Sequence, residues 1–376
     1  MSRLEHVPRR RRPRWWTAAA AGAVVIGAML SVTYYASADE GPDALADAAR
    51  IPNDQGPAPE CLARPSTVDS PSPATVPDKC HANMGGPANT DFIDIRQVKP
   101  AGGNGVRTGR NASTGTFVSV CGTNKEGHHN SDNFIVAPGV TNGAHHVHDY
   151  VGNVTTDGNS TDASLAAGGT TCRFGDKSAY YWPVLRRTNR GAGPDADANG
   201  GGLDGNVGQL LEPVAVRLEF SGNSQSKVRA QPQFIRIITG DAKALTNGPA
   251  NARAKWTCSG FENRTTTKYP VCPQGSQVQR VLEFPSCWDG QNTDSANHRS
   301  HIVFPNPNGK CPRRTSAVPR LTMTISYARQ PAGTFALDSF PEQLHAPITD
   351  HGDFTNVMSQ QLMNFVVGCI NGGRRC

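Results

Sequence analysis

Ten cysteines constrain the fold of this chain more than any other feature of its sequence. They are even in number, all of them follow an apolar segment near the N-terminus, and no two are spaced as C-x-x-C. The missing spacing argues against a zinc ribbon or a thioredoxin-type redox site. Outside the cytoplasm such a set is expected to form disulfides, here between sequence neighbours, with Cys369 and Cys376 closing a small loop. The cysteines are Cys61, Cys80, Cys121, Cys172, Cys258, Cys272, Cys287, Cys311, Cys369 and Cys376.

The N-terminus predicts export. Residues 1–14 are basic, and residues 15–38 are apolar and end in Ala36-Ser37-Ala38. The small residues at that end suit a signal peptidase, whereas the tryptophans and tyrosines flanking the stretch are typical of a membrane anchor near the short limit of about 17–25 residues. Both interpretations place everything after Ala38 outside the cytoplasm. We therefore expect a secreted protein, or one anchored to the cell membrane through residues 15–38.

The distribution of charge argues against a nucleic-acid partner. The chain carries a net charge of +6, and six arginines against Glu5 within residues 1–14 contribute +5 of it, which leaves about +1 for the exported part. Binding to phosphates needs a basic face that displaces counterions. The sequence also lacks ribonucleoprotein, zinc-finger and helix-turn-helix motifs, so we predict no nucleic-acid partner.

Composition divides the exported part into a linker and a domain. Residues 39–90 are rich in Pro, Ala, Ser and Asp without apolar periodicity, which predicts an extended stalk. Cys61 and Cys80 can staple part of this stalk into a loop. Residues 91–376 are long enough to bury a sizeable core, in one large domain or in two intimate subdomains.

Short apolar alternations, separated by Gly, Asn, Asp and Pro clusters, predict many strands joined by turns. In residues 321–328 Leu, Met, Ile and Tyr alternate with Thr and Ser, and residues 214–220 alternate in the same way. Residues 234–240 and 116–122 are further strand candidates. These patterns predict a mainly β fold, of the β-sandwich or jelly-roll type or within the α+β class, with long loops, few helices and disulfide staples.

One segment near the C-terminus predicts an amphipathic helix. Apolar residues from Phe354 to Cys369 follow the 3, 4, 7 spacing of a buried stripe. Asp353 is placed to cap the start of this helix, and Gly372 and Gly373 are placed to end it.

Four segments concentrate side chains that can perform chemistry. In residues 145–149, an extended backbone would place His146 and His148 on one face and His145 and Asp149 on the other. The other segments are residues 289–301 with Asp289, Asp294, His298 and His301, residues 350–353 at the expected helix start, which favours an anionic group, and residues 176–182 with Asp176, Lys177 and Trp182. Three of the four combine His with Asp, so we expect them to converge on one polar pocket.

Each of these residues also has a purely structural interpretation. A histidine beside a Gly or Asn turn is most often a hydrogen-bonded surface residue. Asp353 alone fits a helix cap better than a catalytic acid. Residues 180–182 fit core packing as well as a platform for a sugar ring.

Several motifs in fixed order resemble the DUF1996 family, in the form of an exported bacterial member. The most distinctive is FPSCWDGQNTDSANHRSH at residues 284–301, and the resemblance continues through residues 131–153, residues 168–185 and HGDF at 351–354. It covers about residue 91 to the end. The chain departs from the family in LHAPITDHGDF at residues 344–354, which replaces a Gly- and Tyr-rich run.

The resemblance implies a ligand class without implying a reaction. Members of this family are exported proteins of fungi and bacteria with no assigned activity, often joined to wall-binding or sugar-binding modules, so it implies a cell-wall polysaccharide as the ligand. The shared positions are His146, His148, Asp176, Lys177, Trp182, Trp288, Asp289, Asp294, His298, His301, His351 and Asp353.

Two hypotheses of different class follow. In the first, the domain is a glycan-active hydrolase or lyase in which Asp294 and Asp353 supply acid and base, a histidine moves the proton and a tryptophan stacks a sugar ring. The candidate catalytic residues are Asp294, His301, His148, Asp353 and His351. The candidate ligand-binding residues are His146, Asp149, Asp176, Lys177, Trp182, Trp288, Asp289 and His298. In the second hypothesis, the same pocket binds a wall component without changing it, as a surface or sensor module.

We predict no metal cofactor, because the chain has no HExxH-type or other tight ligand motif. A metal-assisted alternative would use His146, His148 and either His301 or His351 as nitrogen ligands, with an Asp as the carboxylate.

Overall fold

The computed structural model describes residues 87–102 and 105–376, and its main body is a pair of five-stranded sheets. All strand pairs within the two sheets are antiparallel. The first sheet has the order β10 (Trp256–Cys258), β12 (Val278–Glu283), β16 (Arg320–Tyr327), β8 (Ala215–Ser221) and β2 (Thr116–Ser119). The second sheet has the order β3 (His129–Asn130), β4 (His148–Gly152), β5 (Ala179–Pro183), β18 (His351–Thr355) and β9 (Arg236–Gly240).

The two sheets pack face to face around one hydrophobic core. On β16 the apolar residues of the predicted alternation are buried, and on the second sheet Trp182 and Phe354 belong to the same core. The ring of Phe220 on β8 lies 5.8 Å from that of Phe354 on β18, which joins the sheets directly. The prediction of a mainly β fold is confirmed, as are the four predicted strands, which appear as β2, β8, β9 and β16.

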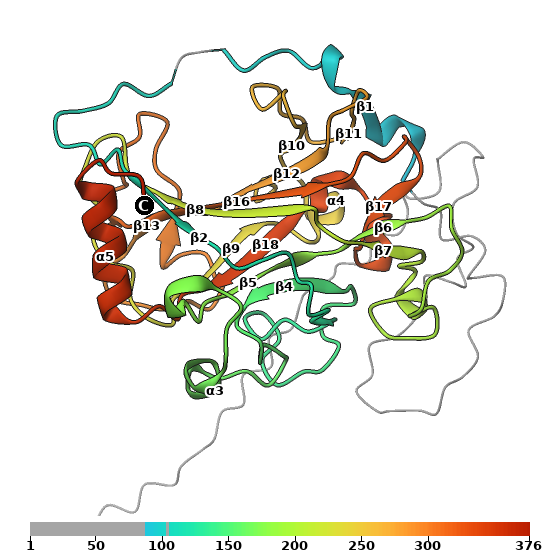
Figure 1. Cartoon of the computed structure of the whole chain (residues 1–376), viewed down its shortest axis with the longest axis horizontal. Helices are drawn as coiled ribbons and strands as arrows, with labels where there is room; N and C mark the ends of the chain where they lie inside the picture. The colour runs from blue at the N-terminus through green and yellow to red at the C-terminus, as the bar shows by residue number, and fades with distance from the viewer. Residues whose placement is uncertain (1–86, 103–104) are drawn as a thin grey trace, which may run out of the picture. The chain divides into compact units, whose positions relative to one another are not determined.

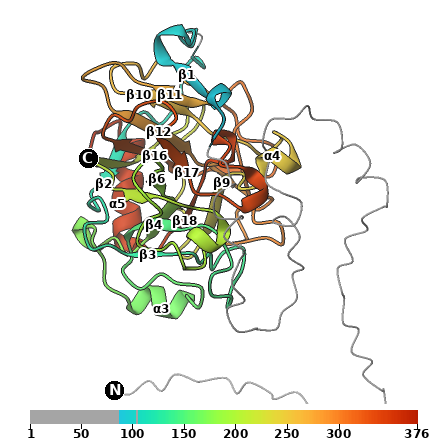
Figure 2. The same cartoon turned by 90° about the vertical axis from the view of Figure 1, so that its right-hand side faces the viewer.

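The other face of the second sheet is covered as well. Tyr150 and Tyr181 point to this face, which we call the outer face, and pack with Phe134 and with Leu165 of the short helix α3 (Asp162–Ala167) in a second buried cluster. In both views α3 lies on the side of β4 away from β16 (Figures 1 and 2). Both faces of the second sheet are therefore packed against other parts of the protein.

Short elements complete the domain around the two sheets. A three-stranded sheet consists of β14 (Ile302–Val303), β13 (Cys287–Trp288) and β15 (Ser316–Ala317). Another consists of β17 (Phe335–Leu337), β6 (Leu185–Arg187) and β7 (Gln209–Leu211). The parallel pair is β1 (Phe92–Asp94) with β11 (Tyr269–Val271), and the helix α4 spans Ala244–Asn247.

The C-terminal helix α5 spans Gln360–Asn371, so the predicted start at Phe354 and the predicted cap at Asp353 are wrong. Residues 351–355 form β18, which pairs with β5 on one side and β9 on the other. Two ladders of backbone hydrogen bonds and the burial of Phe354 outweigh the helical spacing of the apolar residues. The helix begins instead at Gln360 and is capped by Ser359, whose hydroxyl accepts a hydrogen bond from the Leu362 amide.

Disulfides join sequence neighbours, as predicted. The pairs are Cys121–Cys172, Cys258–Cys272, Cys287–Cys311 and Cys369–Cys376, and no described cysteine is left free. Cys61, Cys80, the leader and anchor segments 1–14 and 15–38 and most of the stalk lie outside the described residues. Among residues 87–102 and 105–376, every helix is too short or too polar to cross a bilayer.

A buried ion pair links the two sheets. Arg280 on β12 and Asp350, next to β18, have fully buried side chains, and the Arg280 Nε atom lies 3.1 Å from Asp350 Oδ2. Arg280 also donates to the Pro183 carbonyl at 2.6 Å. A charge in this position is tolerable only while its partner is present, because the core offers no water to replace it.

Replacing Asp350 with Asn is expected to lower the free energy of unfolding by about 3–5 kcal/mol, because it leaves the Arg280 charge buried and unpaired. The matched control is Glu283→Gln, which removes the same kind of charge from the half-exposed pair of Lys255 and Glu283 and should cost at most about 1 kcal/mol. Urea denaturation of the two variants measures the difference. Equal losses would contradict the structural role of the buried pair.

Candidate functional site

Three histidines meet at the end of the outer face of the second sheet. His146 precedes β4, His148 opens β4 and His351 opens β18. His148 pairs with Pro183 on β5, and the pairing of Asp353 with Tyr181 places His351 on the other side of that same row. Pro183 thus lies between His148 and His351 in this row of the sheet. We call His146, His148 and His351 the histidine cluster.

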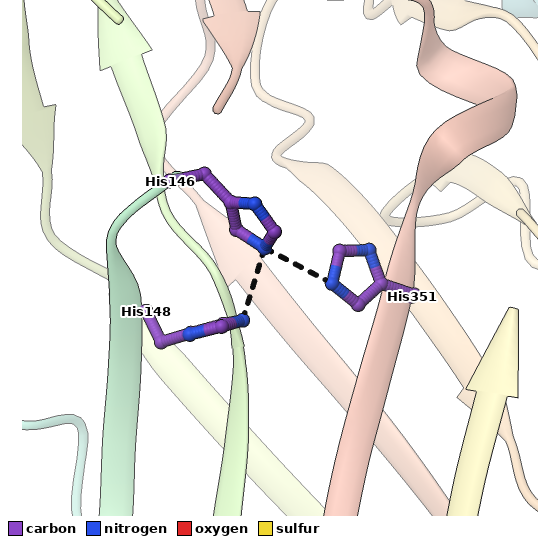
Figure 3. A group of neighbouring side chains, drawn as sticks. All are labelled: His146, His148 and His351. Atoms are coloured by element: carbon purple, nitrogen blue, oxygen red, sulfur yellow. Dashed lines mark hydrogen bonds between the residues drawn. The ribbon is translucent and has the colours of Figure 1, made fainter. Parts of the chain in front are cut away.

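The ring nitrogens of the cluster point at one another (Figure 3). His146 Nε2 lies 3.1 Å from His148 Nε2 and 3.2 Å from His351 Nε2. The far nitrogens of two rings are held by main-chain carbonyls: His148 Nδ1 donates to Asp132 O at 3.0 Å, and His351 Nδ1 donates to Thr349 O at 2.9 Å. These three residues are the histidines of the described chain whose donor atoms lie close enough to hold one metal ion.

Burial keeps the cluster uncharged. The side chains of His146, His148 and His351 belong to residues that are 2 %, 0 % and 5 % exposed. Desolvation lowers the pKa of His146 and of His148 well below the usual range, and the neighbouring imidazoles lower both further. Desolvation also lowers the pKa of His351, to about 4. Neutral imidazoles present lone pairs instead of repelling one another as cations.

A half-buried phenylalanine covers the cluster. The Phe340 ring lies 5.4 Å from the His146 ring, and the ammonium group of Lys243 lies 4.5 Å from the centre of the same ring on its way to solvent. Phe340 itself is partly exposed, so on this side His146 lies one side chain below the surface.

Asp353 follows His351 by two residues along β18 and therefore lies on the same outer face. Its Oδ2 atom accepts from Asn133 Nδ2 at 3.3 Å, while its Oδ1 atom is buried without a hydrogen-bond partner. Desolvation raises the pKa of this carboxyl to about 7. Asn133 also accepts from the Tyr181 hydroxyl at 3.0 Å, so Asp353 belongs to a buried polar network beside the cluster.

An open groove of about 550 Å³ lies farther along the outer face, at the β9 edge. Its wall carries the ion pair of Arg236 and Asp162, 2.8 Å apart, together with the carboxylate of Asp294. Its remaining lining is formed by Phe134, Ile135, Pro138, Ser160, Thr161 and Ala163. The groove thus combines hydroxyls, carboxylates and a guanidinium group with apolar side chains.

The segment 289–301 belongs to this groove and not to the histidine cluster. His298 Nδ1 lies 2.9 Å from Asp294 Oδ1. His301 Nε2 donates to the main-chain oxygen of Arg236 at 2.7 Å, and its Nδ1 faces the Ser295 hydroxyl at 2.9 Å. The three His/Asp segments therefore do not meet at one point. Segments 145–148 and 351–353 form one site, and segment 289–301 forms a second site beyond β9.

Other predicted site residues lie away from both sites. Trp182 is fully buried in the core between the sheets, so its ring is not accessible to a sugar. Asp176 is buried and accepts from the hydroxyls of Ser119 and Tyr180, and Lys177 Nζ donates to the Ala166 carbonyl. Trp182 thus stabilises the fold by packing in the core, and Asp176 and Lys177 stabilise it through hydrogen bonds.

Trp288 and Asp289 bound the loop that leads to Asp294. The indole of Trp288 donates to Asn292 O at 2.7 Å, and Asp289 accepts from the amides of Gln291 and Asn292. Both interactions shape the loop, and only part of the Trp288 ring is exposed.

Asp149 lies on the inner face of the second sheet, opposite the histidine cluster, as the predicted alternation requires. Its Oδ1 atom is 2.7 Å from His129 Nε2 and 2.9 Å from Asn124 Nδ2. Desolvation lowers the pKa of His129, but the hydrogen bond and charge of Asp149 outweigh it, so the pKa of His129 is raised. His145 turns to solvent and pairs with Asp204.

Some residues of the two sites were not predicted from the sequence. Phe340, Asn133 and Asp162 stand in loops or at a helix start with no distinguishing spacing. Arg236 gave a usable signal, because the alternation of residues 234–240 places it, as the polar member, on the face opposite the core.

The fold and sites define a mainly β protein with two packed sheets and a buried polar cluster, and the four disulfides of the described residues are typical of proteins outside the cytoplasm. The family described as "Domain of unknown function (DUF1996)" matches residues 133–357, which is more than half of the chain, and the chain belongs to this family. The match spans the histidine cluster and the groove. No curated protein matches the chain. No solved structure matches it either.

Gly240 on β9 allows β18 to pass close by at the histidine cluster. Its φ is +81°, and a Cβ atom there would stand 2.3 Å from the Asp350 carbonyl oxygen and 2.7 Å from His351 Cα. We expect Gly240→Ala to destabilise the fold by clearly more than the about 1–2 kcal/mol of a left-handed alanine. Gly260→Ala is the control, since Gly260 has φ +84° with no atom near the added Cβ. Urea denaturation measures the free energy of unfolding of both variants. Equal losses of this free energy would show that β18 moves away from the added Cβ without destabilising the fold.

The pairing of His129 with Asp149 should make stability depend on pH. A histidine whose pKa is raised by folding stabilises the native state below its unfolded pKa of about 6.5, and this contribution is lost as the pH rises through the folded pKa. We therefore expect His129→Asn to destabilise the protein most at pH 5.5 and least at pH 8.5. Unfolding in urea at both pH values tests this, and a pH-independent difference would contradict it.

Proposed function

We propose that this protein acts outside the cytoplasm on a cell-wall polysaccharide, which binds in the groove at the β9 edge and is hydrolysed there. The observation that carries the proposal is the lining of that groove, where the partly exposed carboxylate of Asp294 shares the wall with the ion pair of Arg236 and Asp162. Most glycoside hydrolases use a pair of carboxylates that flank the glycosidic bond of the bound sugar.

The groove suits a polyhydroxyl ligand by its chemistry. Carboxylates accept hydrogen bonds from sugar hydroxyls, a guanidinium group donates to them, and an exposed apolar side chain such as Pro138 can cover the carbon face of a ring. The sequence favours Asp294 and Asp353 as the pair of carboxylates, but Asp353 is buried on the covered outer face. In the proposed mechanism the second carboxylate at the groove is therefore Asp162.

His298 is placed to assist Asp294. Its Nδ1 atom lies 2.9 Å from Asp294 Oδ1, close enough to pass or hold a proton during acid or base chemistry. His301 supports this loop from below through its hydrogen bonds to Arg236 and Ser295. We assign His301 a positioning role, because the residue is only 1 % exposed.

The location outside the cytoplasm is supported by two independent features. Four disulfides in the described residues are typical of an oxidising compartment. The basic and apolar N-terminal segments have the pattern of an export signal or a membrane anchor.

A second candidate function is binding of the polysaccharide without cleavage. One observation favours it: Asp353 and the histidine cluster, whose pKa values are strongly shifted by burial, are at most 5 % exposed and do not line the groove. A groove that only binds would serve a surface or sensor module.

Asp294→Asn is expected to reduce the release of reducing ends from wall polysaccharide by at least about 100-fold while binding is retained, because the amide keeps the shape but cannot exchange the proton. Asp289→Asn is the matched control, since Asp289 lies in the same loop and only supports its turn. Both variants are assayed for pull-down on insoluble polysaccharide and for reducing ends.

The outcomes separate the two candidate functions. Cleavage lost only in Asp294→Asn supports the hydrolase. Binding by the wild type with no cleavage across a broad panel of wall glycans supports the binding module. Equal activity of Asp294→Asn and the wild type would remove Asp294 from the mechanism.

A further inference from the structure

We infer that the histidine cluster is a binding site for a divalent transition metal, in which the Nε2 atoms of His146, His148 and His351 supply three ligands and leave one coordination position open. This inference is independent of the groove and of the polysaccharide. It also departs from the expectation drawn from the sequence, which lacks a tight ligand motif because His146 and His148 are separated from His351 by 205 and 203 residues of chain.

The hydrogen atoms of the cluster show why a cation belongs there. A carbonyl oxygen only accepts, so the Nδ1 atoms of His148 and His351 must carry the hydrogens that bond to Asp132 O and Thr349 O. In the neutral rings the two Nε2 atoms then hold lone pairs, and both point toward His146 Nε2. That nitrogen has one hydrogen at most, so it can donate well to only one of its two neighbours.

The alternative tautomer of His146 does not resolve the conflict. With its hydrogen on Nδ1, all three Nε2 atoms direct lone pairs into the same small space, which only a cation can fill favourably. With its hydrogen on Nε2, the Nδ1 atom holds a lone pair that is buried without a partner. Every neutral arrangement of protein atoms alone therefore leaves a buried nitrogen unsatisfied, and such groups are rare in folded proteins.

The spacing of the nitrogens fits metal coordination. Bonds of 2.0–2.1 Å from a tetrahedral zinc ion to two imidazole nitrogens place those nitrogens about 3.3 Å apart. The two separations at His146 are 3.1 Å and 3.2 Å, and the three donor atoms all lie within 4.8 Å of one another. The imidazoles thus stand nearly where ligands would stand.

The surroundings supply the outer contacts that ligating histidines need. Metal-bound histidines usually donate their other N–H to a carbonyl or carboxylate, which fixes the tautomer and the ring orientation. The bonds to Asp132 O and Thr349 O do this for two of the three rings. Asp132 follows β3 and Thr349 precedes β18, so the main chain of the second sheet fixes the orientation of these two rings.

The ligand set indicates the kind of metal and site. Three neutral imidazoles without a thiolate favour zinc, copper, nickel or cobalt over magnesium or calcium, which prefer oxygen. Closed structural zinc sites have four protein ligands, whereas sites with three keep a position for water or substrate. Among the described residues no carboxylate oxygen joins the three nitrogens within 4.8 Å, so the fourth position is left for water or another small ligand.

The test begins with the full chain purified without a polyhistidine tag and stripped with a chelator. Zinc, added alone, is expected to bind with a stoichiometry of one in calorimetry and to raise the melting temperature. Cobalt(II) should give the visible absorption bands of a tetrahedral nitrogen site, which a protein with scattered surface histidines would not show. Absence of both stoichiometric binding and the cobalt spectrum in the folded wild type overturns the inference.

Variants then locate the metal. His148→Ala and His351→Ala are each expected to weaken zinc binding by at least about 100-fold, since loss of an outer partner alone costs about 10–100-fold. His145→Ala is the matched control, because His145 adjoins the cluster in sequence but faces solvent and Asp204. Unchanged binding in the cluster variants, or an equal loss in the control, overturns the assignment.

Two further variants distinguish loss of the metal site from misfolding and from changes in the groove. If an alanine variant does not fold, His148→Gln replaces it with a side chain of similar reach, and the cobalt spectrum of the wild type still decides whether the site exists. Asp294→Asn should bind zinc as the wild type does, because Asp294 lies outside the cluster. Failure of the metal inference therefore leaves the proposed action on polysaccharide standing, and failure of that action leaves the metal site standing.

Discussion

The structure depends on one antiparallel pairing, in which β18 is hydrogen-bonded between β5 and β9. This strand lies in the interior of its sheet, is buried on both faces, and carries apolar side chains on one face and polar side chains on the other. Phe354 points into the core between the sheets, while His351 and Asp353 point to the outer face. A slip of one residue in its register would drive Asp353 into the apolar core and expose Phe354 to the polar face. The register that builds the core is thus the register that assembles the histidine cluster.

Burial on both faces of the second sheet also explains the unusual protonation of its polar groups. An imidazole or carboxyl on a solvated sheet face would keep its ordinary pKa. Here α3 and its flanking loops cover the outer face, so charged forms lose their hydration and neutral forms prevail. The Arg280–Asp350 pair obeys the same constraint in another way, because two buried opposite charges satisfy each other.

Local sequence patterns predicted the fold class well, but they predicted only part of which site residues lie together. The alternation of apolar and polar residues in β8 and β16 is long and unbroken, so it correctly predicted both strands. Residues 351–355 misled the prediction because Phe354 fits both a strand and the first turn of a helix, and only pairing with distant strands decides between them. His146 and His148 could be placed on one face from their spacing. Their meeting with His351, and the separation of His301 from them, depends on the strand order β4, β5, β18, β9, which no local pattern contains.

The residues after α5 pair with the edge of the first sheet. Residues 374–376 lie along β2, the edge strand of the first sheet, with Thr116 N donating to Arg374 O and Cys376 N donating to Thr116 O. The bridge from Cys369 to Cys376 holds this last segment in place. Residues 374–376 thereby occupy part of the border of this edge strand, whose unpaired N–H and C=O groups could otherwise pair with another molecule. Reduction of that single bridge would free the border for intermolecular pairing.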